Sequence, residues 1–299
     1  MGITFINVPI KYGSGREGTD LAFKQLIDNG LNALALESKH KINKIINIEV
    51  KSARANDEYK DHPQLKYLEI VKDVNEKLAS VVYQNLKENN FSYIIGGDHS
   101  LAIGSIAGAS KYFKKFAVIY IDAHGDFNTI KTSTSHNIHG MPLASVLGLK
   151  DAPLKDVFYQ GAKLKAKDLF HIGCHDIDEP EYLLAKKIEL DWYQMSRIKA
   201  EGLEVCVKEI LEKLKENNYD GVHLSFDIDV MDKSLVVATG YPLYDGFYMQ
   251  EIKYILKSFL ETGLVKSMDF VEYNPLLDDK EKSTLKLCLN LIEYSLKYI

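Results

Sequence analysis

The stretch Phe116-Ala-Val-Ile-Tyr-Ile-Asp-Ala-His-Gly-Asp126 joins an unbroken apolar run to a cluster of polar side chains. Residues 116–121 show no alternation of apolar and polar residues, which is typical of a central parallel strand covered on both faces. Alternate residues of the extended backbone that follows point the same way, so Asp122, His124 and Asp126 can be aimed at one point. Like charges at a buried strand end need a cation, so the segment predicts a metal site. The alternative is a loop that carries solvated charge.

On both sides of this segment, short β-rich runs alternate with amphipathic helical stretches. Strands are expected at 4–8, 92–95, 168–173, 221–226 and 265–271, and helices at 64–89, 99–114, 180–187, 205–216, 250–260 and 279–299. A loop at 13–18 leads into a further helix that Thr19 or Asp20 is expected to cap. Repeated β–α alternation predicts a three-layer α/β/α fold with a central, mainly parallel sheet. No linker or repeat is visible, so residues 1–299 are expected to form one domain.

The composition is that of an ordinary globular protein. The chain has 299 residues, of which 46% are hydrophobic and 26% charged, and this balance excludes a disordered chain or a disulfide scaffold. The net charge is −5 and no block of basic residues stands out, which argues against nucleic acid as a partner. The apolar runs are too short to span a membrane, and no signal peptide is evident. Three cysteines without CxxC spacing favour reduced thiols in a cytoplasmic protein.

Two further strand ends carry potential metal ligands. Gly96-Gly97-Asp98-His99-Ser100 follows the strand at 92–95, and its glycines allow a tight turn that exposes His99. The alternative is a plain β–α turn with Asp98 as a cap. Asp227-Ile-Asp229 follows the strand at 221–226, with two carboxylates on one face and Asp232 close behind. The alternative here is an acidic, turn-rich loop.

Because sites in open parallel sheets form at the carboxyl ends of the strands, these two histidines and four aspartates are expected to meet. Oxygen-rich sites with some imidazole suit Mn²⁺ or a related divalent ion, and the absence of cysteine argues against structural zinc. So many carboxylates suggest two metal ions that share bridging aspartates. Such a pair can hold a hydroxide near neutral pH, which predicts hydrolysis at an electrophilic carbon or phosphorus.

A fourth polar cluster, Val271-Glu272-Tyr273-Asn274-Pro275, ends the strand at 265–271. Glu272 could support a metal ligand, act as a general base or bind a cationic substrate, and a guanidinium would match its carboxylate bidentately. The alternative is an exposed glutamate in a turn before Pro275.

At these residues the sequence resembles the ureohydrolase (arginase/agmatinase) family, and it is most like the arginase branch. The likeness runs over nearly the whole chain and implies an arginase-like fold. It rests on the three metal segments already quoted, on Asp126-Phe-Asn128-Thr129 and on Ser135-His-Asn137-Ile-His139-Gly140. Val8-Pro9 with Gly18, and Phe170-His171-Ile172-Gly173 with Asp176-Ile-Asp178, also fit.

The resemblance implies two Mn²⁺ per chain. One would be held by His99, Asp122, Asp126 and Asp227, and the other by His124, Asp122, Asp227 and Asp229, with Asp122 and Asp227 bridging. It implies that the bridging hydroxide attacks the guanidinium carbon of L-arginine, and that the tetrahedral intermediate collapses to urea and L-ornithine.

The same resemblance implies roles for the remaining site residues. His139, Glu272 and the metal ligand Asp126 would be catalytic, with Glu272 orienting the guanidinium and His139 carrying a proton to the leaving amine. Asn128, Ser135 and Asn137 would receive the α-carboxylate of arginine, and Asp178 its α-amino group. Neutral donors suit a carboxylate and an anion suits an ammonium.

Several residues depart from the family pattern. His136 stands where a glycine is usual between Ser135 and Asn137, and Tyr241 stands where a small threonine is usual beside the metal pocket. Lys233, Val237 and Asp245-Gly246 depart within the same segment, which is expected to form one rim of the pocket. The altered residues bear on the substrate pocket, whereas the metal ligands are intact.

Two alternatives therefore stand beside an arginase. A sister ureohydrolase, such as an agmatinase, guanidinobutyrase or formimidoylglutamase, would share the metal chemistry. A non-catalytic, metal-binding relative would bind metal without turnover. The resemblance also implies a homo-oligomer, a trimer or a hexamer.

Overall fold

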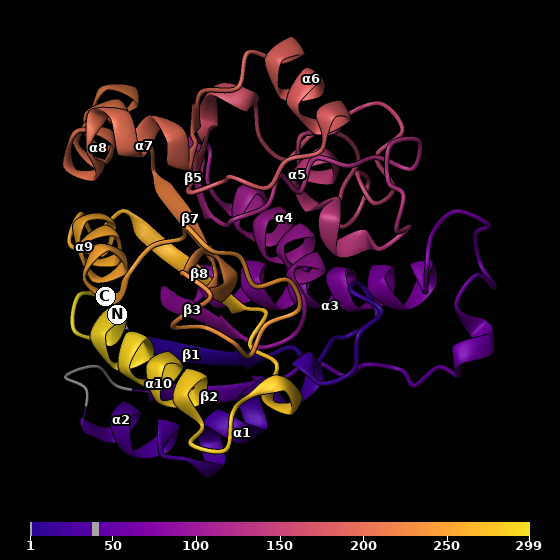
Figure 1. The fold of residues 1–299 in the computed structure, drawn as a ribbon, viewed down its shortest axis with the longest axis horizontal. Helices are drawn as coiled ribbons and strands as arrows, with labels where there is room; N and C mark the ends of the chain where they lie inside the picture. The colour runs from indigo at the N-terminus through magenta and orange to yellow at the C-terminus, as the bar shows by residue number, and fades with distance from the viewer. Residues whose placement is uncertain (1, 38–41) are drawn as a thin grey trace.

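Eight strands pair in parallel to form one sheet in the computed structural model, which describes residues 2–37 and 42–299 (Figure 1). Every pairing between neighbouring strands is parallel, so the sheet is wholly rather than mainly parallel. In spatial order the strands are β2 (Ile42–Asn47), β1 (Gly2–Asn7), β3 (Asn90–Ile95), β8 (Val265–Val271), β7 (Gly221–Asp227), β4 (Phe116–Ile121), β5 (Leu169–Ile172) and β6 (Trp192–Tyr193).

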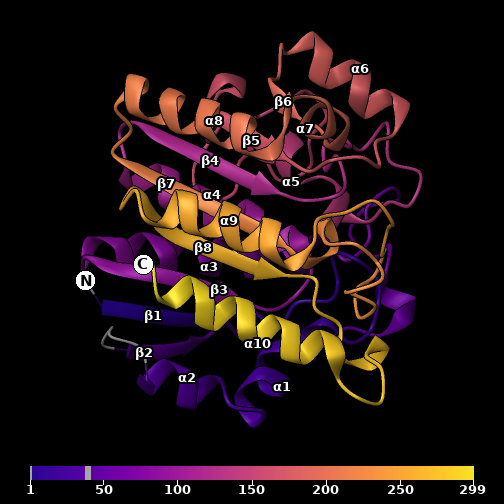
Figure 2. The same ribbon diagram turned by 60° about the vertical axis from the view of Figure 1, so that its left-hand side comes forward.

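Helices cover both faces of this sheet, as Figure 2 shows. One hydrophobic core lies between the sheet and α1 (Ala22–Asp28), α2 (Leu31–Glu37), α7 (Met195–Glu201), α8 (Leu203–Asn217), α9 (Met249–Leu260) and α10 (Ser283–Leu296). A second core lies between the other face and α3 (Leu68–Lys87), α4 (Ala102–Tyr112) and α5 (Pro142–Val146). The remaining described helix is α6 (Glu179–Lys187). The three-layer α/β/α fold expected from the alternation is thus confirmed.

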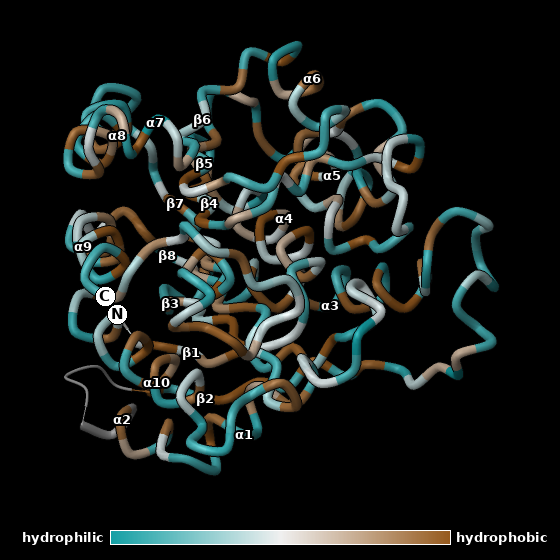
Figure 3. The backbone as a smooth tube through the Cα atoms, in the orientation of Figure 1, coloured by the Kyte–Doolittle hydropathy of each residue, from teal (hydrophilic) through white to brown (hydrophobic). Residues whose placement is uncertain are grey.

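Strand β4 shows why the sheet is built this way. All six of its side chains are buried, three toward each core, because the strand lies inside the sheet between β7 and β5. Figure 3 shows hydrophobic residues along the central strands, whereas the segment that projects beyond α3 is largely hydrophilic. None of the described helices is long and apolar enough to cross a membrane.

The first residues of two helices differ from the expected ones, because hydrogen bonds before each helix hold the chain in another conformation. Helix α3 begins at Leu68 rather than residue 64, because Tyr67 is left-handed (φ 49°) and Lys66 N–H bonds to the carbonyl of His136. Helix α10 begins at Ser283 rather than residue 279, since the carboxylates of Asp278 and Asp279 accept hydrogen bonds from its first N–H groups.

The expected cap at Thr19 or Asp20 is wrong. These residues start a short 3₁₀ turn instead, and α1 follows from Ala22 without a side-chain cap. The Thr19 hydroxyl donates to the carbonyl of Ile10, and the Asp20 carboxylate accepts from Gly18 N–H. Both side chains therefore stabilise the loop at 13–18 rather than the helix.

Candidate metal centre

The turn after β3 places the first ligand candidate. Gly96 and Gly97 have φ of 97° and 80°, and a Cβ on Gly97 would lie 2.6 Å from the carbonyl oxygen of Val8. Asp98 then caps a 3₁₀ turn by accepting from Ser100 N–H, as the plain β–α turn required. Asp98 acting as a cap is compatible with His99 acting as a metal ligand, because the same turn directs the His99 side chain toward β4.

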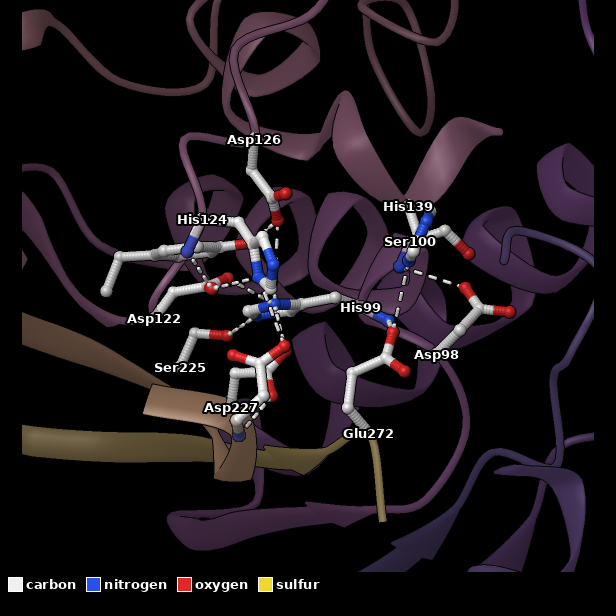
Figure 4. A network of polar contacts seen from close by, with 12 residues as sticks. Asp98, His99, Ser100, Asp122, His124, Asp126, His139, Ser225, Asp227 and Glu272 are labelled. Atoms are coloured by element: carbon white, nitrogen blue, oxygen red, sulfur yellow. Dashed lines mark hydrogen bonds and ion pairs between the residues drawn. The ribbon is translucent and has the colours of Figure 1, made fainter. Parts of the chain in front are cut away.

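The segment after β4 supplies three more candidates. Asp122 N–H bonds to the carbonyl of Ile172 on β5, which keeps the chain extended beyond the strand. Asp126 has φ of 57°, and its carboxylate accepts a 2.6 Å hydrogen bond from the hydroxyl of Tyr120. Asp122 and His124 thus point to one region by the expected alternation, and Asp126 joins them through its left-handed turn; Figure 4 shows all three facing His99.

Asp227 and Asp229 follow β7, the strand that lies beside β4. Asp227 accepts from Asp229 N–H at 2.8 Å, so the backbone turns sharply and both carboxylates stay buried. Asp232 does not join them, because its carboxylate accepts hydrogen bonds from Ser234 and from Asp245 N–H. It therefore stabilises the loop behind the site.

The ligand candidates form two overlapping groups. In the first, His99 Nδ1 lies 2.8 Å from an oxygen of Asp122, 3.0 Å from Asp227 and 3.5 Å from Asp126. In the second, His124 Nδ1 lies 3.1 Å from Asp229 and 3.4 Å from the other oxygen of Asp122. Because Asp122 presents one oxygen to each group, the geometry fits two cations that share a carboxylate.

The hydrogen bonding of His99 tests whether a cation fits. Its Nε2 lies 2.8 Å from the hydroxyl of Ser225, and that hydroxyl donates to Asp269 at 3.2 Å. Nε2 must therefore donate to Ser225, so Nδ1 is the ring nitrogen that is left to face the carboxylates. That nitrogen is buried without a hydrogen-bond partner and faces the oxygens of Asp122 and Asp227. Burial alone would lower the pKa of His99, but Asp122 and Asp227 raise it well above its usual value, so this position favours positive charge. A divalent metal can replace the proton on Nδ1 and bind the same two carboxylates, so the donor set fits such an ion.

The protonation of the aspartates points the same way. Burial, together with the neighbouring charge of Asp122, raises the pKa of Asp126 well above its ordinary value. Burial and the charge of Asp229 likewise raise the pKa of Asp227. Asp122 behaves oppositely, because burial is outweighed by its contacts with His124 and His99, which hold its pKa well below the usual value. Buried carboxylates that resist ionisation together become anionic ligands once cations offset their mutual repulsion.

Glu272 lies next to these ligands at the end of β8. It takes a left-handed backbone (φ 65°), and its Oε1 accepts a 2.8 Å hydrogen bond from His99 N–H. The same oxygen lies 3.4 Å from His139 Nδ1. Burial alone would lower the pKa of His139, but the contact with Glu272 raises it overall. The alternative of an exposed glutamate is wrong, since Glu272 is only 4% exposed.

A cavity of about 230 Å³ opens over the two groups. Its lining contains eleven of the twelve residues that the sequence singled out, namely His99, Asp122, His124, Asp126, Asn128, Ser135, His139, Asp178, Asp227, Asp229 and Glu272. At the outer end, the Asn128 amide donates to the carboxylate of Asp178 at 3.2 Å. Asn137 does not line the cavity. It is 5% exposed, and its Oδ1 is buried near Gly15.

Six lining residues were not among the expected site residues, namely Gly125, Thr134, Gly140, Asp176, Glu181 and Tyr241. Of these, Glu181 and Tyr241 bear on the chemistry of the site. Glu181 accepts from the N–H groups of Phe127 and Asp178, and burial raises its pKa to about 7. The capping box Asp178-x-x-Glu181 was the available signal for it. Tyr241 was noted only as a departure from the family pattern, and it lies against both His124 and His139. His136 adopts φ of 62°, the left-handed region that a glycine would take without strain.

The comparisons with known proteins agree with this geometry. The sequence model of the arginase family matches residues 1–297. The arginase of Bacillus caldovelox is 34% identical over 94% of this chain and 93% of its own, and that of Bacillus subtilis is 34% identical over 97% and 96%. The solved arginase structure from Bacillus caldovelox superposes with a TM-score of 0.90 at 33% identity, covering 99% of this chain and 98% of that one.

A formimidoylglutamase structure from Bacillus subtilis has a TM-score of 0.78 at 20% identity, covering 99% of this chain and 86% of that one, and so shows the fold alone. The family match spans the strands that carry every ligand candidate, and the His/Asp groups are those that a metal-dependent hydrolase needs. The chain therefore belongs to the arginase family.

Proposed function

We propose that this protein is a binuclear manganese amidinohydrolase that converts L-arginine and water to L-ornithine and urea. One observation carries the proposal: two His/Asp groups share Asp122 at the base of a cavity that also contains Glu272 and His139. Neither a structural metal site nor a plain acidic loop needs a buried carboxylate and an imidazole beside the ligands. The named arginases among the relatives support the same reaction.

The proposed ligands are four residues for each ion. His99, Asp122, Asp126 and Asp227 would hold one Mn²⁺, and His124, Asp122, Asp227 and Asp229 the other. When bound, such a pair would lower the pKa of a water molecule so that it can attack at neutral pH. Asp126 is kept in place by Tyr120, and His99 by Ser225, so these ligands are oriented before an ion arrives.

Glu272 is the proposed partner of the substrate guanidinium. Because His99 N–H holds Oε1, the carboxylate is fixed in direction and Oε2 remains available to the substrate. A carboxylate accepts a guanidinium through charge-assisted hydrogen bonds, which would bring the guanidinium carbon over the metal groups. His139 would then deliver a proton to the nitrogen of the leaving amine as the C–N bond breaks.

The outer end of the cavity would select the substrate. Asn128, Ser135 and Asn137 would bind the α-carboxylate, and Asp178 the α-ammonium. Asn128 and Asp178 are already hydrogen-bonded to each other, so groups of both kinds stand side by side at the mouth. Asn137 lies outside the lining, so its contribution would come through Ser135, whose hydroxyl accepts a hydrogen bond from Asn137 N–H. Agmatine lacks the carboxylate and would not use these donors.

A product assay tests the proposal. Protein loaded with Mn²⁺ is offered L-arginine, agmatine, 4-guanidinobutyrate and N-formimidoyl-L-glutamate separately, and urea and formamide are measured. We expect urea from L-arginine, about two Mn per chain by elemental analysis, and a KM for arginine raised about tenfold in Asn128→Ala. An unchanged KM would refute the carboxylate role. Preference for another compound would keep the metal chemistry and reassign the substrate, and full metal occupancy without turnover would favour a non-catalytic protein.

A homo-oligomer and a cytoplasmic location remain predictions, as does the treatment of residues 1–299 as one domain.

A further inference from the structure

Tyr241 occupies an unusual position on the cavity wall. Its ring centroid lies 5.7 Å from that of His139 and 6.1 Å from that of His124. It thus lies close to both the proposed proton carrier and a proposed metal ligand. Tyr241 is not packed into the hydrophobic core, since 39% of the residue is exposed. A large aromatic ring that borders a polar cavity in this way presents its π surface to whatever enters.

Arg16 covers part of this ring. Its guanidinium carbon lies 4.3 Å from the ring centroid, a cation–π geometry. Arg54 and Arg197 both bind carboxylates, whereas Arg16 forms no ion pair with any residue in 2–37 or 42–299. Its partner is therefore the ring itself. The contact with Arg16 shows that the Tyr241 ring can bind a guanidinium through its π surface.

The backbone around Arg16 is anchored to the site from both sides. Gly13 N–H donates to Asp98, and the carbonyl of Gly13 accepts from His139 N–H. On the other side, the amide of Asn274 donates to the carbonyl of Glu17. A loop fixed at both ends holds Arg16, and through it the orientation of the Tyr241 ring, without occupying the cavity itself.

Tyr241 also adjoins the end of the cavity where a guanidinium would be bound. A Cβ placed on its neighbour Gly240 would lie 3.9 Å from Glu272 Oε2, the oxygen that the proposed function leaves for the substrate. The space for the guanidinium is therefore bounded by Glu272 on one side, the metal groups below and the Tyr241 ring beside His139. A planar cation in that space has a carboxylate at its edge and an aromatic ring within reach.

We propose that Tyr241 is a specificity-determining residue that packs on the substrate guanidinium and excludes substituents on its terminal nitrogens, while Arg16 acts as a positioning residue for the ring. This inference rests on the proposed function, because it assigns the guanidinium to that end of the cavity. It adds a requirement of its own: the substrate must carry a guanidinium whose terminal nitrogens are unsubstituted.

Four variants separate the ring from its surroundings. Tyr241→Phe keeps the ring and removes the hydroxyl, Tyr241→Leu keeps apolar bulk without π electrons, and Tyr241→Ala removes the wall. Arg16→Met keeps an apolar side chain beside the ring and removes the guanidinium. Tyr244→Leu is the matched control, since Tyr244 lies in the same segment, is 67% exposed and does not line the cavity. Each protein is assayed with Mn²⁺ added on L-arginine and on Nω-methyl-L-arginine, and the affinity for both compounds is measured by calorimetry on the metal-free protein, which cannot turn them over.

We expect Tyr241→Leu to raise the KM and the calorimetric Kd for L-arginine about three- to tenfold, with kcat changed less, and Tyr241→Phe to stay within about twofold of the wild type. Tyr241→Ala should reduce the discrimination against the methylated substrate by about tenfold or more. Arg16→Met should raise KM by a smaller factor without changing kcat, which a loss of folded protein would not mimic. Tyr244→Leu should match the wild type.

The outcomes also separate this inference from the proposed function. If no guanidino compound is hydrolysed but the wild type binds L-arginine and Tyr241→Leu weakens that binding, the proposed function fails and the role of Tyr241 stands. If arginine is hydrolysed and Tyr241→Leu leaves both KM and Kd unchanged, the inference is wrong and the function stands. A wild type that binds no guanidinium compound overturns both.

Discussion

At the scale of single residues, three residues in or beside the site have a left-handed backbone. Asp126, His136 and Glu272 all have φ between 57° and 65°, a region that residues other than glycine rarely occupy. Asp126 and Glu272 redirect the chain beyond β4 and β8 and thereby point into the cavity, whereas His136 lies in the loop before Asn137. Such conformations persist where surrounding contacts hold them, here the Tyr120 hydroxyl and His99 N–H.

His139 gives the clearest prediction at this scale. It is the imidazole beside Glu272 that contacts no proposed metal group directly, so its removal should leave metal binding intact. We expect His139→Ala to lower kcat for the preferred guanidino substrate by about 100-fold or more, with KM changed by less than about threefold, because general acid–base catalysis contributes about that factor. The measurement is steady-state kinetics together with elemental analysis.

His175→Gln is the matched control for that experiment. His175 follows β5 at the same end of the sheet and does not line the cavity; its ring nitrogens lie near the carbonyls of Gly173 and Tyr244. The kcat of the His175→Gln variant should equal that of the wild type. A His139→Ala variant that keeps full kcat, or that loses its manganese, would contradict the assigned role.

The ligand candidates could be predicted residue by residue because period-two spacing survives folding. Asp122 and His124 converge as their alternation required, whereas Asp126 reaches the same region through its left-handed backbone. The role of Glu181 could not be read in the same way, because its side chain reaches the site from the first turn of α6 by bonding to Phe127 N–H, about fifty residues away. Long-range contacts of this kind leave no local pattern.

At the scale of elements, the packing of α3 against α4 is set by two glycines. A Cβ on Gly104 would lie 2.5 Å from the carbonyl oxygen of Asn75, and one on Gly108 would lie 2.4 Å from that of Ala79. These glycines let the two helices approach to backbone contact. Because α4 directly follows the turn that carries His99, this helix pair supports the metal centre from one side of the sheet.

We therefore expect Gly108→Ala to destabilise the fold even though alanine favours helix formation. The backbone of α3 cannot yield as a flexible side chain would, and forcing a methyl group into such a contact costs about 1–3 kcal/mol of unfolding free energy. Urea unfolding followed by circular dichroism measures the loss. Lys111→Ala, at an exposed position of the same helix, should stay within about 0.5 kcal/mol of the wild type. A Gly108→Ala protein at least as stable as the wild type would show that the helices can separate without loss.

Elements with strong apolar patterns were predictable, and elements defined by their neighbours were not. Strands β4 and β8 have the expected bounds. Strand β4 is an unbroken apolar run, and in β8 at most two consecutive polar residues interrupt the apolar ones. Strand β2 lies at one edge of the sheet with most of its residues exposed or half-buried, and β6 has only two residues. Neither contains an apolar run of strand length, and pairing with β1 and β5 is what makes these residues strands.

At the scale of the whole molecule, the hydrophobic core on one side of the sheet contains a histidine beneath the site. The core beside α3 and α4 contains a buried polar residue, His171 on β5, which is 0% exposed. Neither ring nitrogen of His171 has a hydrogen-bond partner among the described residues. Its ring lies instead against Tyr120, Phe127 and Trp192. A histidine held among three aromatic rings is stable there only in its neutral form.

This burial predicts how the fold responds to acid. It lowers the pKa of His171 to about 4 in the folded protein, against about 6.5 in an unfolded chain. Between these values the unfolded state binds a proton that the folded state does not, so stability falls as pH drops below about 6.5 and this loss is complete near pH 4. Above pH 7 both states are neutral and His171 has no effect on the pH dependence.

His171→Leu removes this one titration and leaves the others in place. We expect the wild type to lose about 2 kcal/mol more unfolding free energy than the variant between pH 7 and pH 5, whatever their difference at pH 7. Urea unfolding at both pH values measures the two losses, and comparing slopes cancels the change in packing that the substitution causes. Equal losses would mean that the folded protein admits a proton, and with it water, to the ring of His171. In that case the apolar layer beneath the metal centre would not be sealed, and the low-polarity surroundings that strengthen the charge interactions of its ligands would have to come from the cavity walls alone.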